Sequence, residues 1–282
     1  MRRAKWRKTM KFQVDGAVAI VTGASSGIGW HLCRQLFQRG AVVIAVARRE
    51  QRLLQLRDEL ASEIDRSGSN TKSVNAIDRF QFVVGDVTDA AVRGQAMELA
   101  SRLGDGRLDL IVNNAGIGAI GPFEMATEER LRRIMEVNFF APCEWTRVAL
   151  PLLHRGRNAV ICNVSSVLGH RAVPDKSEYC ASKFALHGWS DSLRAELAAS
   201  GIQVTLVSPS TTSSEFFGSV IGSEAGVESN SVGSWTPDRV ARATLAAIIA
   251  RRSEVILSLG GKALVYADRI APALVNFAVA QK

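Results

Sequence analysis

Short apolar runs alternate with amphipathic helical segments along almost the whole chain, and this alternation restricts the fold more than any other feature. Runs of four to eight consecutive apolar residues are typical of parallel strands that are buried on both faces. Seven short segments of mainly apolar residues predict such strands, at residues 17–21, 41–46, 80–84, 108–112, 159–164, 204–207 and 255–257. Helical patterns lie between them, at about 28–37, 49–64, 89–103, 127–153, 177–200 and 237–251. Because right-handed crossovers leave few other solutions, we expect an α/β fold with one doubly wound parallel sheet and helices on both faces.

No linker rich in Pro, Gly or Ser divides the chain, so we expect one domain over residues 14–260. Residues 1–13 form a basic tail that we expect to be disordered. Residues 261–282 form an apolar helical extension, which Asp268, Arg269 and Pro272 interrupt. This extension could complete the core, cover a pocket or join a partner subunit. A helix lying on a lipid surface is a weaker alternative because the charges are few.

The formal net charge of +8 invites a nucleic-acid interpretation, but the distribution of the charge argues against it. Six Lys and Arg residues fall within the first eleven residues, and the rest of the chain is only slightly basic. Without a basic stripe or interleaved aromatic residues, we expect no nucleic-acid partner. A weak electrostatic attachment of the tail to an anionic membrane or to RNA stays open.

The four cysteines, Cys33, Cys143, Cys162 and Cys180, are widely spaced and contain no C-x-x-C pair. This spacing supports neither a zinc site nor a disulfide framework, so we expect no metal. Scattered cysteines in a chain of this size suit the reducing cytoplasm. We find no uninterrupted apolar run of 18 residues and no apolar core of a secretory signal, so we expect a cytoplasmic protein without an integral membrane segment.

A glycine-rich turn, TGASSGIG at residues 22–29, connects the first apolar run to the first helical pattern. Gly23 allows a sharp turn, Gly27 allows the backbone to approach a pyrophosphate, and Gly29 allows the helix to pack closely on the strand. The free N–H groups and the positive dipole end at the helix start favour an anion. We therefore expect Ser25, Ser26 and Ile28 to bind phosphate together with the glycines, although a purely structural turn is the alternative.

The end of the second strand favours NADP(H) over NAD(H). A dinucleotide site that selects NAD places a carboxylate there to bind the ribose 2′-hydroxyl. Here Ala47 occupies that position, and Arg48 and Arg49 follow with guanidinium groups that can pair with a 2′-phosphate. The alternative is that both arginines are surface charges at the start of a helix.

Tyr179 and Lys183 lie four residues apart on one face of a predicted helix. A phenol has a pKa of about 10, and an adjacent ammonium would lower it and make Tyr179 a workable acid/base. Ser166 stands thirteen residues earlier, just after the run 159–164, at a strand end where open α/β sheets bind ligands. Asn138 lies inside a helical pattern, where Asn is unfavourable, so it has either a functional role or a structural hydrogen bond.

These motifs together resemble the short-chain dehydrogenase/reductase family. TGASSGIG, NNAG at residues 113–116, the single Asn138, Ser166 and YCASK at residues 179–183 occur in the order and spacing of that family. The resemblance covers roughly residues 14–260, and several independent motifs agree. It implies a Rossmann fold and an NADP(H)-dependent oxidoreductase that transfers a hydride between the nicotinamide and a carbonyl or secondary alcohol.

The resemblance also implies roles for single residues. Tyr179 would donate or remove the proton, Ser166 would orient the substrate oxygen, and Lys183 would hold the nicotinamide ribose and lower the pKa of Tyr179. Asn138 would hold the water of a proton relay. Ser165 is a competing serine, but Ser166 has the more usual spacing to Tyr179. The family pattern also implies adenine contacts at Asp86 and Val87, and a cleft lined by Asn113, Ala115 and Gly116.

One departure from the family pattern follows the run 204–207. The family has Pro-Gly and then a Thr that binds the nicotinamide carboxamide, whereas this chain has SPSTTSS at residues 208–214. Ser210 replaces the glycine, which matters if that turn needs positive φ. Ser214 keeps the hydroxyl at the Thr position, and Pro209 and Thr212 complete the expected cofactor contacts.

The segment 213–235 corresponds to the family's substrate lid, with Phe216, Phe217 and Trp235 as apolar side chains that either contact substrate or pack against the sheet. The resemblance further implies a small-molecule partner and a homodimer or homotetramer. Two alternatives to an active enzyme stay open: a catalytically silent NADP(H)-binding regulatory protein, and a binding protein that uses the basic tail. The complete set of Asn138, Ser166, Tyr179 and Lys183 favours the enzyme. Its substrate stays open among ketosteroids, acyl thioesters, retinoids and sugar ketones.

Overall fold

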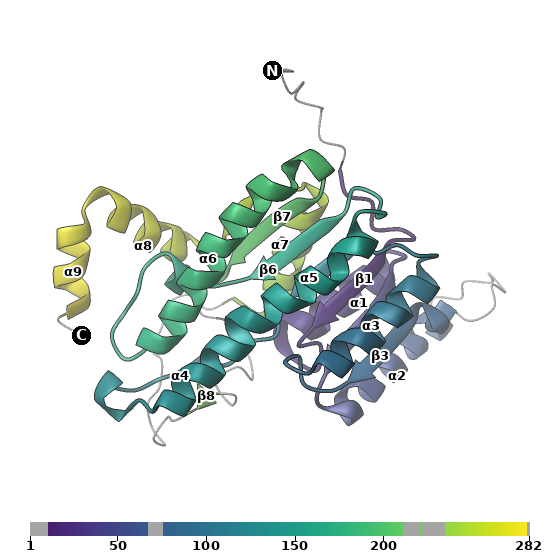
Figure 1. Cartoon of the computed structure of the whole chain (residues 1–282), viewed down its shortest axis with the longest axis horizontal. Coiled ribbons are helices and arrows are strands. Elements are labelled where there is room, and N and C mark those ends of the chain that lie inside the picture. Colours follow the sequence, from purple (N-terminus) through teal and green to yellow (C-terminus); the bar gives the residue numbers. More distant parts are fainter. Residues whose placement is uncertain (1–10, 67–75, 211, 213–219, 222–234, 281–282) are drawn as a thin grey trace.

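The computed structural model describes residues 11–66, 76–210, 212, 220–221 and 235–280. Seven parallel strands form its central sheet in the order β3-β2-β1-β4-β6-β7-β9 (Figure 1). These strands are β1 Val18–Thr22, β2 Val42–Ala47, β3 Phe80–Val84, β4 Leu110–Asn113, β6 Val160–Val164, β7 Gln203–Ser208 and β9 Glu254–Ile256. A separate parallel pair joins β5 Gly118–Ala119 to β8 Val220–Ile221.

Helices cover both faces of the sheet, and two further helices extend from one end of the molecule (Figure 1). One face packs against α1 Gly27–Gln38, α2 Glu50–Arg66 and α7 Pro237–Ile249. The other packs against α3 Ala90–Leu103, α5 Ala141–Leu153 and α6 Ser177–Leu197. A π-helical turn, Glu136–Phe140, joins α4 Glu128–Met135 to α5. The extending helices are α8 Leu259–Ile270 and α9 Pro272–Ala280. Short 3-10 turns occur at Ala76–Arg79, Phe123–Met125, Val167–Gly169 and Ala198–Ser200.

Across the described ranges, we find no helix with both the length and the apolar character that a membrane crossing requires.

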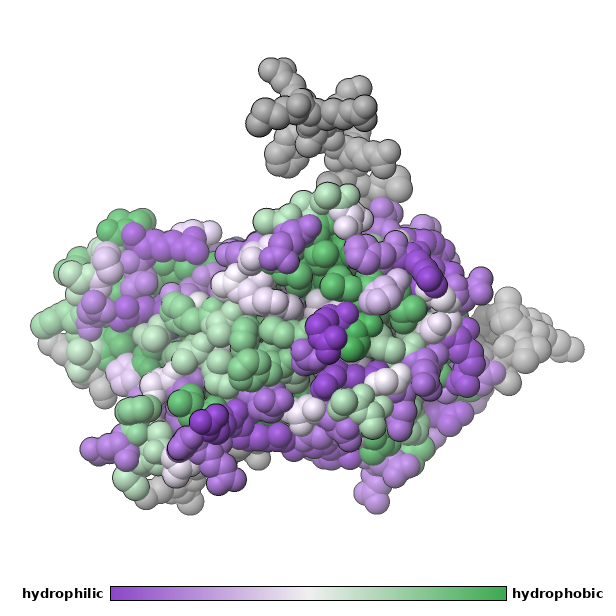
Figure 2. Space-filling view, in the orientation of Figure 1, coloured by the Kyte–Doolittle hydropathy of each residue, from purple (hydrophilic) through white to green (hydrophobic). Residues whose placement is uncertain are grey.

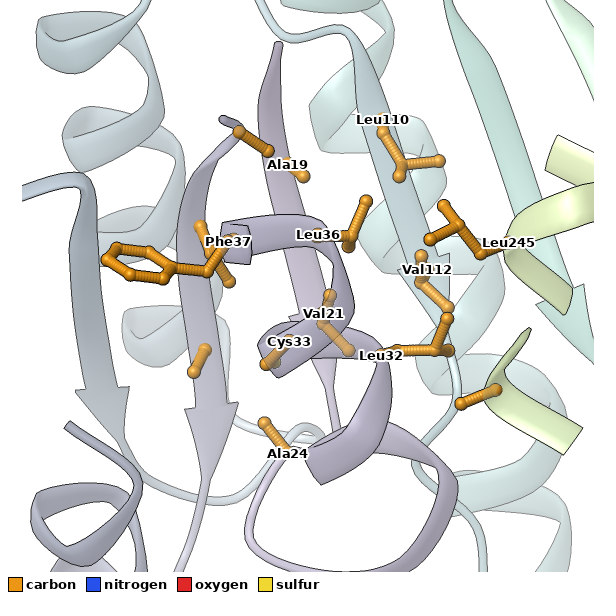
Figure 3. Close-up of a cluster of buried hydrophobic side chains, with 14 of the residues drawn as sticks. Ala19, Val21, Ala24, Leu32, Cys33, Leu36, Phe37, Leu110, Val112 and Leu245 are labelled. Atoms are coloured by element: carbon orange, nitrogen blue, oxygen red, sulfur yellow. The ribbon is translucent and has the colours of Figure 1, made fainter. Parts of the chain in front are cut away.

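The continuous apolar strands follow from this two-sided burial. Successive side chains of a strand point to opposite faces, so a strand with helices on both sides needs apolar residues throughout. In β1, Val21 packs in the cluster formed with α1, whereas Ile20 packs in the cluster on the α3 side. Figure 3 shows how Leu32 and Leu36 of α1 meet Val112 of β4 on the first of these faces.

The expected fold class is confirmed, because the seven apolar runs are the seven strands of one parallel sheet. Phe12 lies two residues before the expected start of the domain at residue 14, where it is buried and its N–H donates to the Ile249 carbonyl at 2.9 Å. Residues 1–10 of the predicted tail lie outside the described residues. The C-terminal extension is helical, but α8 begins at Leu259, and Val265 is buried against Val167. The extension therefore packs on the domain.

Leu36→Ala should destabilise the protein by about 2–5 kcal/mol, because it leaves a cavity between α1 and the sheet at a fully buried position. Leu54→Ala on α2 is the matched control, since that side chain is 40% exposed and should change stability by less than about 1 kcal/mol. Urea unfolding followed by circular dichroism measures both. Equal losses in the two variants would contradict the assigned core.

Candidate active site

A cavity of about 1290 Å³ lies at the carboxyl ends of the strands, with residues from both sides of the β1–β4 junction in its lining. The chain leaves β1 toward β2 and later returns to β4 on the other side, so strand order reverses there. Open α/β sheets bind ligands at such a switch point. The lining of the cavity brings together the glycine turn, residues 114–116 of the NNAG segment, and the side chains of Ser166, Tyr179 and Lys183.

The glycine turn has a shape that only glycine permits at two positions. Gly23 has a φ of +68°, and a Cβ added there would lie 2.8 Å from the Cα of Ala115. A Cβ on Gly29 would overlap the carbonyl oxygen of Gly23 and would lie 2.6 Å from Nδ2 of Asn114. Gly29 does not line the cavity, so its role is the close packing of α1 against the turn.

The start of α1 is suited to an anion. Ser25, Ser26, Gly27 and Ile28 line the cavity. Among the residues that the structure describes, the Ser26 side chain accepts no hydrogen bond from the first N–H groups of α1. The first turn of α1 contains no acidic residue. The first N–H groups of a helix need partners from outside it, and the helix dipole favours a negative charge there. This geometry fits the phosphates of a dinucleotide.

The end of β2 presents positive charge to the cavity. Ala47, Arg48 and Arg49 line it, and no carboxylate occupies the position where a dinucleotide fold would select NAD. Arg49 Nε donates to Ser25 Oγ at 3.1 Å and so links β2 to the glycine turn.

Asp86 and Val87 also line the cavity, where Asp86 is paired with a residue that the sequence did not single out. Arg133 Nη2 lies 2.7 Å from Asp86 Oδ2, and both the N–H and the hydroxyl of Thr88 donate to Oδ1. Burial opposes ionisation of Asp86, but these hydrogen bonds and the arginine outweigh it and lower the pKa of the carboxyl. Arg133 adds a cation to this end of the cavity, and no sequence motif identifies it.

The NNAG segment is held by the side chain of Thr22. Its Oγ1 accepts from the N–H groups of Asn114 at 3.0 Å and Ala115 at 3.1 Å, and Asn114 Nδ2 donates to the Thr22 carbonyl at 2.9 Å. Ala115 and Gly116 line the cavity as expected, and so does Asn114, which the sequence analysis left out.

Asn113 does not reach the cavity, which corrects the expectation placed on it. Its amide donates to Thr146 Oγ1 at 3.1 Å and to Asn163 Oδ1 at 2.8 Å. The alternation of side chains along β4 turns Asn113 into the helix layer, where this buried network satisfies its side-chain N–H groups.

Asn138 lies in the π-helical turn and is fully buried. Its Oδ1 accepts from the Ile117 N–H at 2.9 Å, and its Nδ2 donates to the Ile117 carbonyl and to Ser182 Oγ. These bonds show the structural role that the sequence analysis held as one alternative. They fasten the loop at Ile117, which lines the cavity, although Asn138 itself does not line it.

Ser166 and Tyr179 are brought together by a hydrogen bond between their hydroxyl groups. Lys183 lies one helical turn beyond Tyr179, with its Nζ 5.7 Å from the centre of the tyrosine ring and 3.1 Å from the Val164 carbonyl, to which it donates. Ser165 also lines the cavity, but Tyr179 bonds to Ser166.

A buried ion pair holds the start of α6 beside Tyr179. Nε and Nη2 of Arg130 on α4 donate to the two carboxylate oxygens of Glu178, each at 2.8 Å. Both side chains are buried. This two-bond contact orients the residue that precedes Tyr179 in the chain.

The acidity of Tyr179 differs from the expectation. Burial raises the pKa of Tyr179 to about 12, although the Ser166 hydrogen bond acts in the opposite direction. Burial also lowers the pKa of Lys183 to about 8. The pKa of Tyr179 therefore lies above that of a free phenol rather than below it, because loss of solvent disfavours the phenolate and is the largest influence on this group.

Part of the segment after β7 borders the cavity. Pro209, Ser210 and Thr212 line the cavity, and Ser210 is not among the described residues with positive φ. The turn therefore accepts a serine. Ser214 and the lid residues Phe216 and Phe217 lie outside the described residues.

Trp235, at the end of the predicted lid, serves in packing. It lies against the core cluster on the α1 face, and the Arg239 guanidinium stacks on its ring at 4.0 Å. Thr212 and Trp235 form a parallel bridge, so the two ends of this segment meet.

Three residues that the sequence analysis did not combine, His170, His187 and Glu254, place potential ligand atoms within 4.8 Å of one another. His170 Nε2 lies 3.0 Å from Glu254 Oε1 and 3.2 Å from Ser208 Oγ. These hydrogen bonds account for the position of His170. The three residues come from parts of the chain far apart in sequence, which is why no spacing revealed them.

Comparison with known proteins identifies the family. A sequence profile described as short chain dehydrogenase matches residues 17–224. The chain belongs to the short-chain dehydrogenase/reductase family. Dehydrogenase/reductase SDR family member 7B of Xenopus laevis is 31% identical over 267 residues, which cover 93% of this chain and 80% of that protein. The 3-ketodihydrosphingosine reductase of Bacteroides thetaiotaomicron is 33% identical over 193 residues, 68% of this chain and 62% of that protein.

Solved structures share the architecture. A short-chain dehydrogenase from Burkholderia cenocepacia J2315 in complex with NADP aligns with a TM-score of 0.75 and 26% identity, covering 95% of this chain and 98% of that one. A short-chain dehydrogenase/reductase from Burkholderia phymatum in complex with NAD aligns with a TM-score of 0.78 over 93% and 96% of the two chains. At 23% identity, the second alignment shows the fold alone.

Gly29→Ala should weaken NADPH binding by about tenfold or more, because the new methyl group forces α1 away from the Gly23 carbonyl and displaces the phosphate-facing N–H groups. Gly94→Ala on α3 is the control, since no atom lies within 4 Å of the added Cβ. That variant should bind NADPH normally and gain about 0.5–1 kcal/mol in stability. NADPH fluorescence and thermal unfolding measure both quantities. Normal NADPH affinity in Gly29→Ala would contradict the assignment of the turn.

Proposed function

We propose that the protein is an NADP(H)-dependent oxidoreductase that interconverts a carbonyl and a secondary alcohol, with Tyr179 as the proton donor or acceptor. The observation that carries the proposal is the Tyr179 hydroxyl, bonded to Ser166 in the same cavity as a glycine turn fit for phosphates. Within that cavity, a substrate oxygen that contacts both hydroxyl groups would be oriented by Ser166 and protonated by Tyr179.

The residues present fit an NADP(H) cofactor. The α1 N-terminus suits the pyrophosphate, Arg48 and Arg49 supply cations for a 2′-phosphate, and Lys183, which lines the same cavity, would bond to ribose hydroxyls. When bound, the cofactor supplies or accepts the hydride. The absence of a carboxylate at the end of β2 supports NADP(H) over NAD(H).

The acidity of Tyr179 suits it to the role of proton donor in carbonyl reduction. With a pKa of about 12, the phenol keeps its proton at neutral pH and can donate it to a forming alkoxide. Lys183, with a pKa of about 8, is mostly an ammonium at neutral pH and stabilises the negative charge that develops on the phenol oxygen. The name of the Bacteroides relative, a reductase, agrees with this direction.

The surface and the cysteines support two further parts of the proposal. We infer a cytoplasmic protein, because the four cysteines are free, as expected in a reducing compartment. We infer a homodimer or homotetramer, because Phe140 beside α5 and Phe184 on α6 are 48% and 44% exposed and would be covered in an assembly.

Tyr179→Phe should lower the rate of carbonyl reduction by about 10²–10⁴-fold, because it removes the proton donor. NADPH affinity should change little. The chain has two tyrosines, so Tyr266→Phe on α8 is a matched control that should keep full activity. The loss of NADPH absorbance with a panel of ketones measures the rates. Equal turnover by the parent protein and Tyr179→Phe would contradict the role of Tyr179 as proton donor. If the parent protein bound NADPH without turnover of any ketone, the result would favour the regulatory alternative.

Arg48→Ala should weaken NADPH by about 10- to 100-fold and NADH by less than about threefold, because only NADPH carries the 2′-phosphate. Arg52→Ala on α2 is the control, since Arg52 does not line the cavity. Fluorescence titration with each cofactor measures the affinities. If NADPH and NADH weakened equally, Arg48 would not contact the 2′-phosphate.

The kcat/KM for carbonyl reduction should fall as pH rises through about 8. Below that pH, Lys183 is charged and stabilises the phenolate formed when Tyr179 donates its proton, and above it the ammonium is lost. The pH–rate profile between pH 6 and 10, with intrinsic fluorescence as a check on folding, measures this. A flat profile across pH 8 would exclude the role of the Lys183 charge.

A further inference from the structure

The C-terminal helices form one wall of the cavity. Leu264 of α8 and the α9 residues Leu274, Val275, Ala278 and Val279 line it. These helices lie beyond residues 17–224, the part of the chain that matches the family profile. Figure 1 shows both helices extending from the end of the molecule opposite α2, and Figure 2 shows apolar residues interspersed with hydrophilic ones at that end.

The wall is joined to the loop that carries Ser166. Val265 of α8 is buried against Val167, and Ser258 Oγ caps α8 by accepting from the Gly261 N–H at 3.0 Å. Arg171, in the same loop, pairs with Asp268 of α8 at 3.1 Å and donates to Asn276 of α9 at 2.6 Å. Because these contacts fix both helices relative to Ser166, the wall stands at a set position beside the Ser166 segment.

The wall is aliphatic and carries no charge into the cavity. The charged residues of the hairpin, Lys262, Asp268 and Arg269, are not among the lining residues. Leu168, Val173 and Pro174 add apolar surface from the segment after Ser166, and the charged Asp175 and Lys176 mark the end of that surface in the cavity lining. Polar substrate groups covered by this wall would lose hydrogen bonds to water, so a sugar ketone fits poorly.

The shape of the wall favours an extended chain. Two pairs of α9 lining residues are spaced four apart, Leu274 with Ala278 and Val275 with Val279. Because residues at this spacing are neighbours on a helix surface, they form a continuous strip along α9. The cavity of about 1290 Å³ exceeds the roughly 300–1,000 Å³ of common ligand sites, which leaves space beside a dinucleotide.

We propose that the substrate is a long, straight-chain aliphatic ketone, whose hydrocarbon chain lies along the α8–α9 wall while its carbonyl contacts Ser166 and Tyr179. The reaction balances as the proposed function requires: the carbonyl carbon gains a hydride, the oxygen gains the Tyr179 proton, and the reduced nicotinamide is oxidised. This inference rests on the proposed function for the chemistry, and on the wall for the substrate class.

The test compares a series of ketones, from 2-butanone to 2-dodecanone, in the full-length protein with NADPH. Each added methylene that enters the wall should raise kcat/KM about fourfold, until the wall is filled. Val275→Asp should flatten this dependence and lower kcat/KM for 2-dodecanone at least tenfold, with 2-butanone changed less than twofold. Phe277→Asp is the matched control on the same helix, because Phe277 is 65% exposed and does not line the cavity.

Two measurements separate the possible failures. Three results would contradict the assignment of the wall to the substrate chain. These are a kcat/KM that is independent of ketone chain length, an unchanged dependence on chain length in Val275→Asp, and a preference for a steroid ketone over 2-dodecanone. Calorimetric titration of 2-dodecanone into the NADP⁺ complex reports binding without turnover. If the parent protein bound 2-dodecanone but reduced no ketone, and Val275→Asp abolished that binding, the result would support the wall as the binding surface and contradict the proposed function.

Discussion

The hydrogen bonds of Thr22 are the contact on which the rest of the site depends. This residue ends β1 and begins the glycine turn, and its hydroxyl holds the N–H groups of Asn114 and Ala115 after β4. It therefore joins the two strands between which the sheet reverses its order. If these strand ends separated, the turn at Gly23 and the loop at Gly116 would no longer border one cavity.

The same burial that shapes the cavity sets its chemistry. Removing Tyr179 and Lys183 from water disfavours both charged forms, so the tyrosine remains a phenol and the lysine becomes less basic. A proton donor that is neutral at rest suits carbonyl reduction. The buried pair of Arg130 and Glu178 holds the helix start that carries the tyrosine, which keeps its hydroxyl at Ser166.

Much of the site could be predicted because strand ends and helix starts meet at one edge of a parallel sheet. Gly23, Arg48, Ser166 and Tyr179 each follow a recognisable pattern, and the fold brings all four to the cavity. Arg133 could not be predicted, because its position depends on how α4 packs rather than on a local motif. For the same reason, the wall formed by α8 and α9 was one of several open alternatives.

The amino-acid sequence by itself determined the order of strands and helices, the two-sided burial of the sheet and the glycine turn, because periodicity and backbone freedom are local properties. Only the tertiary structure decided that Asn113 turns away from the cavity, that Asn138 holds the backbone of Ile117, and that Tyr179 is less acidic than a free phenol. These outcomes depend on solvent exclusion and on partners distant in the chain, and neither can be read from residue spacing.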